Sequence, residues 1–79
     1  MKASVTKSVL ELISKILGRN LDLKVVNLPR KEIDGWDSLI HMEIIFACED
    51  LFQIEFTSEE MTSLNSVETI VDCICVKLQ

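Results

Sequence analysis

The chain has 79 residues, which is enough for one small domain over residues 1–79 and not for two. It is 48% apolar, which argues against intrinsic disorder, and its net charge of −5 argues against nucleic-acid binding, because phosphate contacts need clustered Lys and Arg. No apolar stretch approaches the ~20 residues that span a bilayer, and the amphipathic N-terminal pattern differs from a signal peptide, so we expect a cytoplasmic protein without a membrane span.

The first predicted element is an amphipathic helix over residues 4–17. Its apolar residues recur at helical spacing: Val5, Val9, Leu12, Ile13, Ile16 and Leu17. Ser4 is a candidate N-cap, and Gly18 is a suitable helix end. Residues 18–36 contain Asn, Pro and Gly and do not continue the pattern, so we predict a long loop that is functional or packed down. A short strand over residues 21–25 is the alternative, although no partner strand is evident.

Three further helices are predicted, over residues 38–52, 58–63 and 67–78. The candidate caps are Asp37 for the second helix, a capping box of Thr57 and Glu60 for the third, and Ser66 for the fourth. Two glycines, one proline and no tyrosine also favour helices over a turn-rich β fold. The sequence therefore predicts an all-α fold, a four-helix bundle with a short third helix and a long loop between the first two helices.

The helix over residues 38–52 has two apolar sides. At about 100° per residue, one side collects Ile44, Ile45, Cys48 and Phe52, with His41 beside them. This side has no acid, so we assign it to the core and His41 to the core margin. The other side combines Leu39 and Phe46 with Glu43 and Asp50, near Ile40, which is typical of a binding surface. The alternative is a helix that is buried on both sides.

Charge is distributed unevenly along the chain. Residues 1–31 hold seven bases and two acids, whereas residues 32–76 hold eleven acids and no Lys or Arg. An acidic stretch without internal partners indicates a surface for a basic partner, and the alternative is a solubilising coat.

The three cysteines are Cys48, Cys73 and Cys75, and all lie in periodic apolar segments. We interpret them as small buried apolar residues. The chain has one His and a lone Cys-x-Cys, which does not supply the ligand pairs of a zinc site, so we expect no metal. A small enzyme or redox protein that uses His41 or the cysteines is a minor alternative.

Ser38 is the residue at the most distinctive position, because it follows the long loop and opens a helix. Its hydroxyl fits a nucleophile, a modification site or a capping residue. A nucleophile needs a base and an oxyanion hole, which the sequence does not indicate. A modification site needs neither, because a second enzyme supplies the chemistry, and a phosphodiester there would be stabilised by the helix N-terminus. Spacing alone does not exclude simple capping.

The segment Gly35-Trp36-Asp37-Ser38-Leu39 resembles the phosphopantetheine attachment motif Gly-x-Asp-Ser-Leu of acyl carrier proteins. The likeness continues through the helix over residues 38–52, and then through Gln53-Ile54-Glu55-Phe56, Ser58-Glu59-Glu60 and Ser66-Val67-Glu68-Thr69-Ile70, in order and spacing. The first helix and the long loop also fit, so the resemblance covers the whole chain.

The resemblance implies an up-down-down bundle in which Ser38, flanked by Asp37 and Leu39, carries a covalent 4′-phosphopantetheine arm derived from coenzyme A. The arm would hold acyl groups as thioesters, and the chain itself would be a carrier and not an enzyme. The implied partners are a phosphopantetheinyl transferase, an acyl-activating ligase or acyltransferase, and a ketosynthase or other acyl-processing enzyme with a basic patch. The implied docking residues are Glu43, Phe46, Asp50, Glu49, Glu55 and Ile40. Such carriers also shelter acyl chains between their helices, and we expect a monomer.

Two departures bear on the pathway. Ile40 stands where carriers of fatty acid synthesis usually have an acid, and His41 follows it. Trp36 before Asp37 resembles discrete carriers of polyketide, hybrid peptide or amino-acyl pathways, so we expect specialised biosynthesis. The rival hypothesis is an acidic helical interaction module in which Ser38 is only a helix cap. The Met1 start and short ends favour an independent protein.

Overall fold

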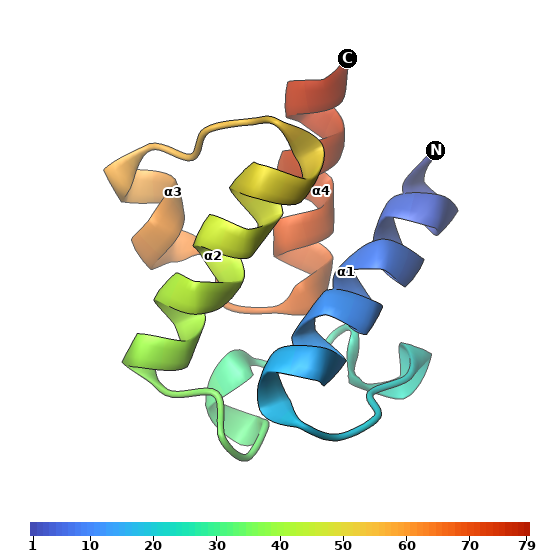
Figure 1. The fold of residues 1–79 in the computed structure, drawn as a ribbon, viewed down its shortest axis with the longest axis vertical. Helices are drawn as coiled ribbons and strands as arrows, with labels where there is room; N and C mark the ends of the chain where they lie inside the picture. The colour runs from blue at the N-terminus through green and yellow to red at the C-terminus, as the bar shows by residue number, and fades with distance from the viewer.

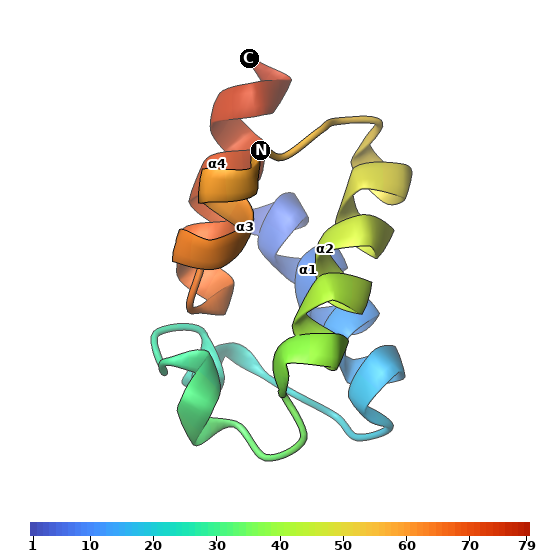
Figure 2. The same cartoon turned by 90° about the vertical axis from the view of Figure 1, so that its left-hand side faces the viewer.

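Four α-helices and no strand make up the computed structural model, which describes residues 1–79: α1 (Lys2–Leu17), α2 (Ser38–Phe52), α3 (Ser58–Ser63) and α4 (Val67–Leu78). The predicted all-α bundle with a short third helix is therefore confirmed. α1 packs against α2 and α4 and runs opposite to both, while α3 lies to one side (Figures 1 and 2). No helix has the length and apolar character needed to cross a membrane.

The first helix begins earlier than its sequence signals indicate. α1 starts at Lys2 with Met1 as its N-cap residue, so the prediction of Ser4 as N-cap is wrong. The Ser4 hydroxyl instead donates to the Met1 carbonyl within the first turn, at 2.9 Å. The helix ends as predicted at Gly18, whose φ of 72° places it in the left-handed region that glycine tolerates best.

The long loop contains two 3₁₀ helices, η1 (Leu23–Val25) and η2 (Arg30–Glu32), so the alternative of a strand over residues 21–25 is wrong. The reason is local, because the Asp22 carboxylate accepts a hydrogen bond from the Lys24 amide at 2.9 Å and closes a turn. The loop packs down as predicted, with Ile33 and Trp36 buried. It passes beneath the start of α4 (Figure 2), where the Glu68 amide donates to the Val26 carbonyl at 3.0 Å.

The three remaining helix starts follow the sequence. The Asp37 carboxylate accepts from the Ile40 amide at 2.8 Å and caps α2. Thr57 and Glu60 form the predicted capping box of α3, and Ser66 caps α4 in a second box with Thr69. These caps fix where each helix begins and therefore place Ser38 at the first position of α2.

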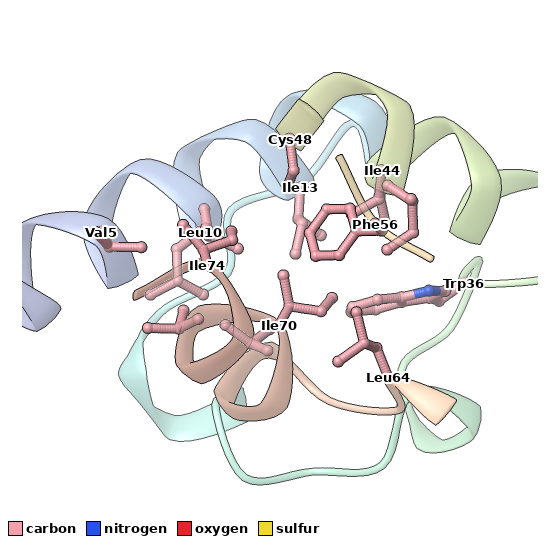
Figure 3. Packing of buried hydrophobic residues seen from close by; sticks show 14 of the residues in the cluster. Val5, Leu10, Ile13, Trp36, Ile44, Cys48, Phe56, Leu64, Ile70 and Ile74 are labelled. Atoms are coloured by element: carbon pink, nitrogen blue, oxygen red, sulfur yellow. The ribbon is translucent and has the colours of Figure 1, made fainter. Parts of the chain in front are cut away.

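Figure 3 shows that the core is made by α1, α2 and α4 together. Its fully buried residues are Val9, Ile13, Ile44, Ile45, Cys48, Val67, Ile70, Val71 and Ile74. Trp36 and Leu64, which lie outside the helices, close one end of this core (Figure 3). Each fully buried Ile or Val contributes about 1.5–3 kcal/mol relative to exposure.

The cysteines are free, and Cys48 is the one that packs into the core completely. Burial away from water disfavours the thiolate and raises the pKa of Cys48 to about 12. Its interpretation as a small buried apolar residue is confirmed. Cys73 and Cys75 are half-buried at the edge of the same cluster.

Candidate functional site

Ser38 is the exposed first residue of α2, at the point where the loop of residues 18–37 ends. Its hydroxyl takes part in no hydrogen bond, because Asp37 provides the cap. The interpretation of Ser38 as a capping residue is therefore wrong. The amides of Ser38 and Leu39 also bond no backbone carbonyl, in keeping with the first turn of any helix. The serine thus presents a free hydroxyl beside two free N–H groups.

Gly35 shapes the approach to this serine. Its φ of 89° lies in the left-handed region, so the backbone turn before Trp36 favours glycine. A Cβ at this position would stand 3.4 Å from the Leu17 side chain, in ordinary contact. Backbone conformation, more than lack of space, therefore explains the glycine at the start of the motif.

A surface groove of about 790 Å³ lies beside Ser38. Its walls are residues 29–31, 36 and 37 of the loop and Ser38 of α2, together with Thr62, Ser63 and Asn65 at and after the end of α3. The Arg30 amide donates to the Asn65 carbonyl and ties the two walls together. The sequence analysis did not assign Arg30 and Lys31 to the site. The available signal was that they are the last bases before the acidic stretch that contains Ser38.

Trp36 and His41 connect the loop of residues 18–37 to α2 and α3. The Trp36 indole Nε1 donates to His41 Nδ1 at 3.0 Å, and His41 Nε2 lies 2.8 Å from the Met61 carbonyl oxygen. Because a carbonyl only accepts, Nε2 carries the proton and the ring is neutral. Burial lowers the pKa of His41 and the nearby Arg30 charge adds to this effect, whereas the hydrogen bond to Met61 opposes it. His41 is 3% exposed and fully bonded, which confirms its position at the core margin.

The outer side of α2 is exposed, so the alternative of a helix buried on both sides is wrong. Leu39 is 76% exposed and Phe46 is 54% exposed, and Glu43 and Asp50 also face solvent. Ile40 is half-buried and packs against the core cluster. The side assigned to the core is buried at Ile44, Ile45 and Cys48 and half-buried at Phe52.

A second groove, of about 700 Å³, lies at the C-terminal end of α2. Four of the predicted docking residues line it: Phe46, Glu49, Asp50 and Glu55. Gln53 and Ile54, which the sequence analysis did not assign, complete it, while Glu43 and Ile40 lie outside. The left-handed Gln53, with φ 55°, turns the chain so that Glu55 returns towards the helix end. The groove therefore gathers three carboxylates around an exposed phenyl ring.

The three carboxylates of this groove differ in the bonds that they form within the protein. Glu49 is half-buried, and its carboxylate accepts from the Phe56 amide at 2.8 Å, so it also anchors the segment that leads to α3. Asp50 and Glu55 form no ion pair, because the two ion pairs of the structure are Lys2–Asp72 and Lys77–Glu60. Their charges remain available to a basic partner.

The chain is similar in sequence to several known proteins. No family model matches the chain. It is 38% identical over 72 residues to the acyl carrier protein of Buchnera aphidicola subsp. Acyrthosiphon pisum (strain Tuc7), covering 86% of this chain and 90% of that protein. It is 34% identical over 71 residues to the acyl carrier protein of Buchnera aphidicola subsp. Schizaphis graminum, covering 90% of each chain. A third acyl carrier protein, from Buchnera aphidicola subsp. Baizongia pistaciae, is 36% identical over 73 residues, covering 90% of this chain and 91% of that protein. The fold, the exposed serine and these relatives agree, and the chain belongs to the acyl carrier protein family.

Proposed function

We propose that this protein carries acyl groups as thioesters on a 4′-phosphopantetheine arm bonded to Ser38, and that it catalyses no reaction itself. The observation that carries the proposal is the free, exposed Ser38 hydroxyl within Gly35-Trp36-Asp37-Ser38-Leu39, in a chain of this family. Attachment would form a phosphodiester at Ser38 Oγ and release the nucleotide part of coenzyme A. A separate transferase would supply the base, which agrees with the absence of one in hydrogen-bond contact with Ser38.

The residues around Ser38 fit such an arm. Asp37 holds the first turn of α2 in place through its 2.8 Å bond to the Ile40 amide. The free amides of Ser38 and Leu39 favour the negative charge of a phosphodiester, because helix N-terminal N–H groups stabilise anions. The arm supplies a flexible tether with a terminal thiol, which raises the effective concentration of the bound acyl group at a docked enzyme.

Docking is proposed for the outer side of α2 and the groove at its end. The exposed residues there are Glu43, Phe46, Asp50 and Glu55, and none of the three carboxylates forms an ion pair. Exposed carboxylates around an exposed aromatic ring fit basic patches on a phosphopantetheinyl transferase, an acyl-activating ligase or acyltransferase, and a ketosynthase. Such contacts give fast and salt-sensitive association, as a carrier that visits several enzymes requires.

For the pathway, we propose specialised polyketide, hybrid peptide or amino-acyl biosynthesis. Its support is the sequence departure at Ile40 and the Trp36–His41 pair. Ile40 places an apolar side chain against the core where fatty acid carriers usually have an acid.

The deciding experiment is the intact mass of the protein after incubation with coenzyme A and a promiscuous phosphopantetheinyl transferase. We expect one phosphopantetheine to be added to the wild type and none to Ser38→Ala. The matched control is Ser63→Ala, which removes another exposed hydroxyl from the same groove and should gain the full mass. No mass gain in the wild type, or a gain that persists in Ser38→Ala, would overturn the proposal. The mass of protein purified from its own cell would identify the acyl group.

A further inference from the structure

The groove beside Ser38 has a charge that contrasts with the rest of the acidic part of the chain. Arg30 and Lys31 line it, and neither forms an ion pair, although Glu32 and Asp34 follow closely in sequence. No other Lys or Arg lines the groove, and residues 32–76 contain none. Two unpaired positive side chains therefore share a groove with the hydroxyl to which the arm is proposed to bond.

A backbone hydrogen bond holds Arg30 beside the groove, and the charge of its side chain acts on His41. Arg30 opens η2, it is half-buried, and its amide bonds the Asn65 carbonyl. Its guanidinium charge helps to lower the pKa of His41, which lies one turn into α2. Arg30 and Ser38 line the same groove, so a phosphate on Ser38 would share this groove with the guanidinium.

The opposite wall offers polar groups that can form further hydrogen bonds. The Asn65 side chain is exposed and takes part in no hydrogen bond, so its amide can both donate and accept. The hydroxyls of Thr62 and Ser63 donate to carbonyls of α3, which leaves their oxygen lone pairs free to accept. Trp36 and Pro29 are the two apolar residues among the nine that line the groove. This wall therefore matches a ligand with hydroxyl and amide groups better than a hydrocarbon chain.

We propose that Arg30 and Lys31 bind the phosphodiester of the arm, and that Asn65 bonds one of its amides, so that the arm rests in this groove between η2 and α3. The inference depends on the proposed function, because it concerns an arm attached at Ser38. The ligand chemistry is a phosphodiester followed by a hydroxyl and two amides. Arginine suits the first of these groups, since its guanidinium binds phosphate oxygens through paired N–H donors.

The resting position has a consequence for delivery. The groove and the acidic surface at the far end of α2 have no lining residue in common, so a resting arm leaves the docking residues uncovered. Because Lys31 and Asn65 are exposed, each contact is weak, and a docked enzyme with its own binding tunnel can withdraw the arm. The groove thus holds the arm between enzymes without preventing transfer.

The test is NMR on the loaded protein with ¹⁵N-labelled pantetheine, after intact mass has confirmed loading. In the wild type at low salt we expect nuclear Overhauser contacts from the arm to Asn65 and Thr62, and arm amide order parameters above the value of about 0.6 that marks flexible groups. The Arg30→Gln, Lys31→Gln double variant should lose these contacts and fall below about 0.6. The matched control is Lys7→Gln, Lys15→Gln, which removes two bases from α1 and should behave like the wild type.

The outcomes separate this inference from the proposed function. If Ser38 gains no arm, the proposed function fails. If the arm is added but is flexible in the wild type and contacts neither Asn65 nor Thr62, only the resting site fails. The wild-type measurement is decisive by itself, so the inference stays testable even if the double variant is not loaded or does not fold.

Discussion

The Trp36 indole Nε1 donates to Nδ1 of His41 across 3.0 Å, and this bond joins the loop of residues 18–37 to the first turn of α2. The two rings lie with their centroids 6.0 Å apart and an interplanar angle of 30°. His41 passes the connection on to α3 through its 2.8 Å bond to the Met61 carbonyl. The arrangement requires a neutral imidazole, because a protonated ring has no acceptor for the indole N–H. Protonation of His41 would therefore break the bond between the imidazole and the Trp36 indole.

The stability of the protein should fall as the pH falls from 7.5 to 5. Burial lowers the pKa of His41 in the folded state, whereas the same imidazole in the unfolded chain has its ordinary pKa of 6.5. The unfolded state consequently binds the proton first, and the free energy of unfolding decreases below pH 6.5. Urea unfolding at several pH values measures this slope, and His41→Gln, which keeps a neutral donor and acceptor, should flatten it. An equal slope in His41→Gln would contradict the assignment.

Asp37 and Ser38 should respond differently to alanine substitution. Asp37→Ala removes the carboxylate that accepts from the Ile40 amide and should cost about 1 kcal/mol of stability. Ser38→Ala removes a hydroxyl without a partner and should stay within about 0.5 kcal/mol of the wild type. Asp37→Asn preserves a good cap and is the control. The midpoints of urea unfolding show which variant loses more stability. A larger loss of stability in Ser38→Ala than in Asp37→Ala would show that the Ser38 hydroxyl caps the helix.

The ion pair between Glu60 and Lys77 should be visible as a shifted carboxyl titration. Lys77 Nζ lies 2.9 Å from Glu60 Oε1, and this contact, with the Thr57 amide, lowers the pKa of Glu60 from 4.5 to about 2. A lowered carboxyl pKa contributes stability that is present above pH 4.5 and is lost as the pH falls towards 2. In Lys77→Met the Glu60 pKa should rise part of the way to 4.5, since the Thr57 bond remains.

NMR titration of the Glu60 side chain measures this shift. Lys2→Met breaks the other ion pair of the structure, with Asp72, and should leave the Glu60 titration unchanged. An unchanged Glu60 pKa in Lys77→Met would mean that this half-buried ion pair is not formed in solution. Loss of the shift in both variants would instead point to a general change in net charge.

Features that depend on neighbours in sequence were predictable. Asp37, Thr57 and Ser66 cap helices through bonds to residues three positions away, so their residue types and spacing are sufficient. The helical period likewise separated buried Ile44 from exposed Phe46. The prediction of Ser4 as the N-cap was wrong because α1 begins without a side-chain cap. The Met1 carbonyl accepts the first backbone hydrogen bond of the helix, from the Val5 amide.

Features that depend on distant residues were not predictable. His41, which is bonded to Trp36, contacts the Met61 carbonyl, and the Arg30 amide contacts the Asn65 carbonyl, only after the loop has folded against α3. No short segment of the sequence therefore predicts the groove beside Ser38, because its lining comes from segments that are distant in the chain. The groove at the end of α2 depends in the same way on the left-handed turn at Gln53, which no glycine marks.

The docking surface gives the last prediction. Glu43→Lys and Phe46→Ala should each lower the rate of acyl transfer from a partner enzyme several-fold, because they remove a charge and an apolar contact from the exposed side of α2. Neither side chain is buried, so stability should change by less than about 0.5 kcal/mol. Glu11→Lys makes the same charge change on an exposed position of α1 and is the control.

The salt dependence of transfer distinguishes docking from a general charge effect. If Glu43 meets a basic patch, raising the ionic strength should slow the wild type towards the rate of Glu43→Lys, since exposed charges are screened beyond about 10 Å at 0.1 M salt. Glu11→Lys should keep the wild-type rate and salt dependence, because it lies away from the contact. If Glu11→Lys slows transfer as much as Glu43→Lys does, net charge alone explains the effect. If Phe46→Ala unfolds the bundle instead, the assignment of Phe46 to the docking side is wrong.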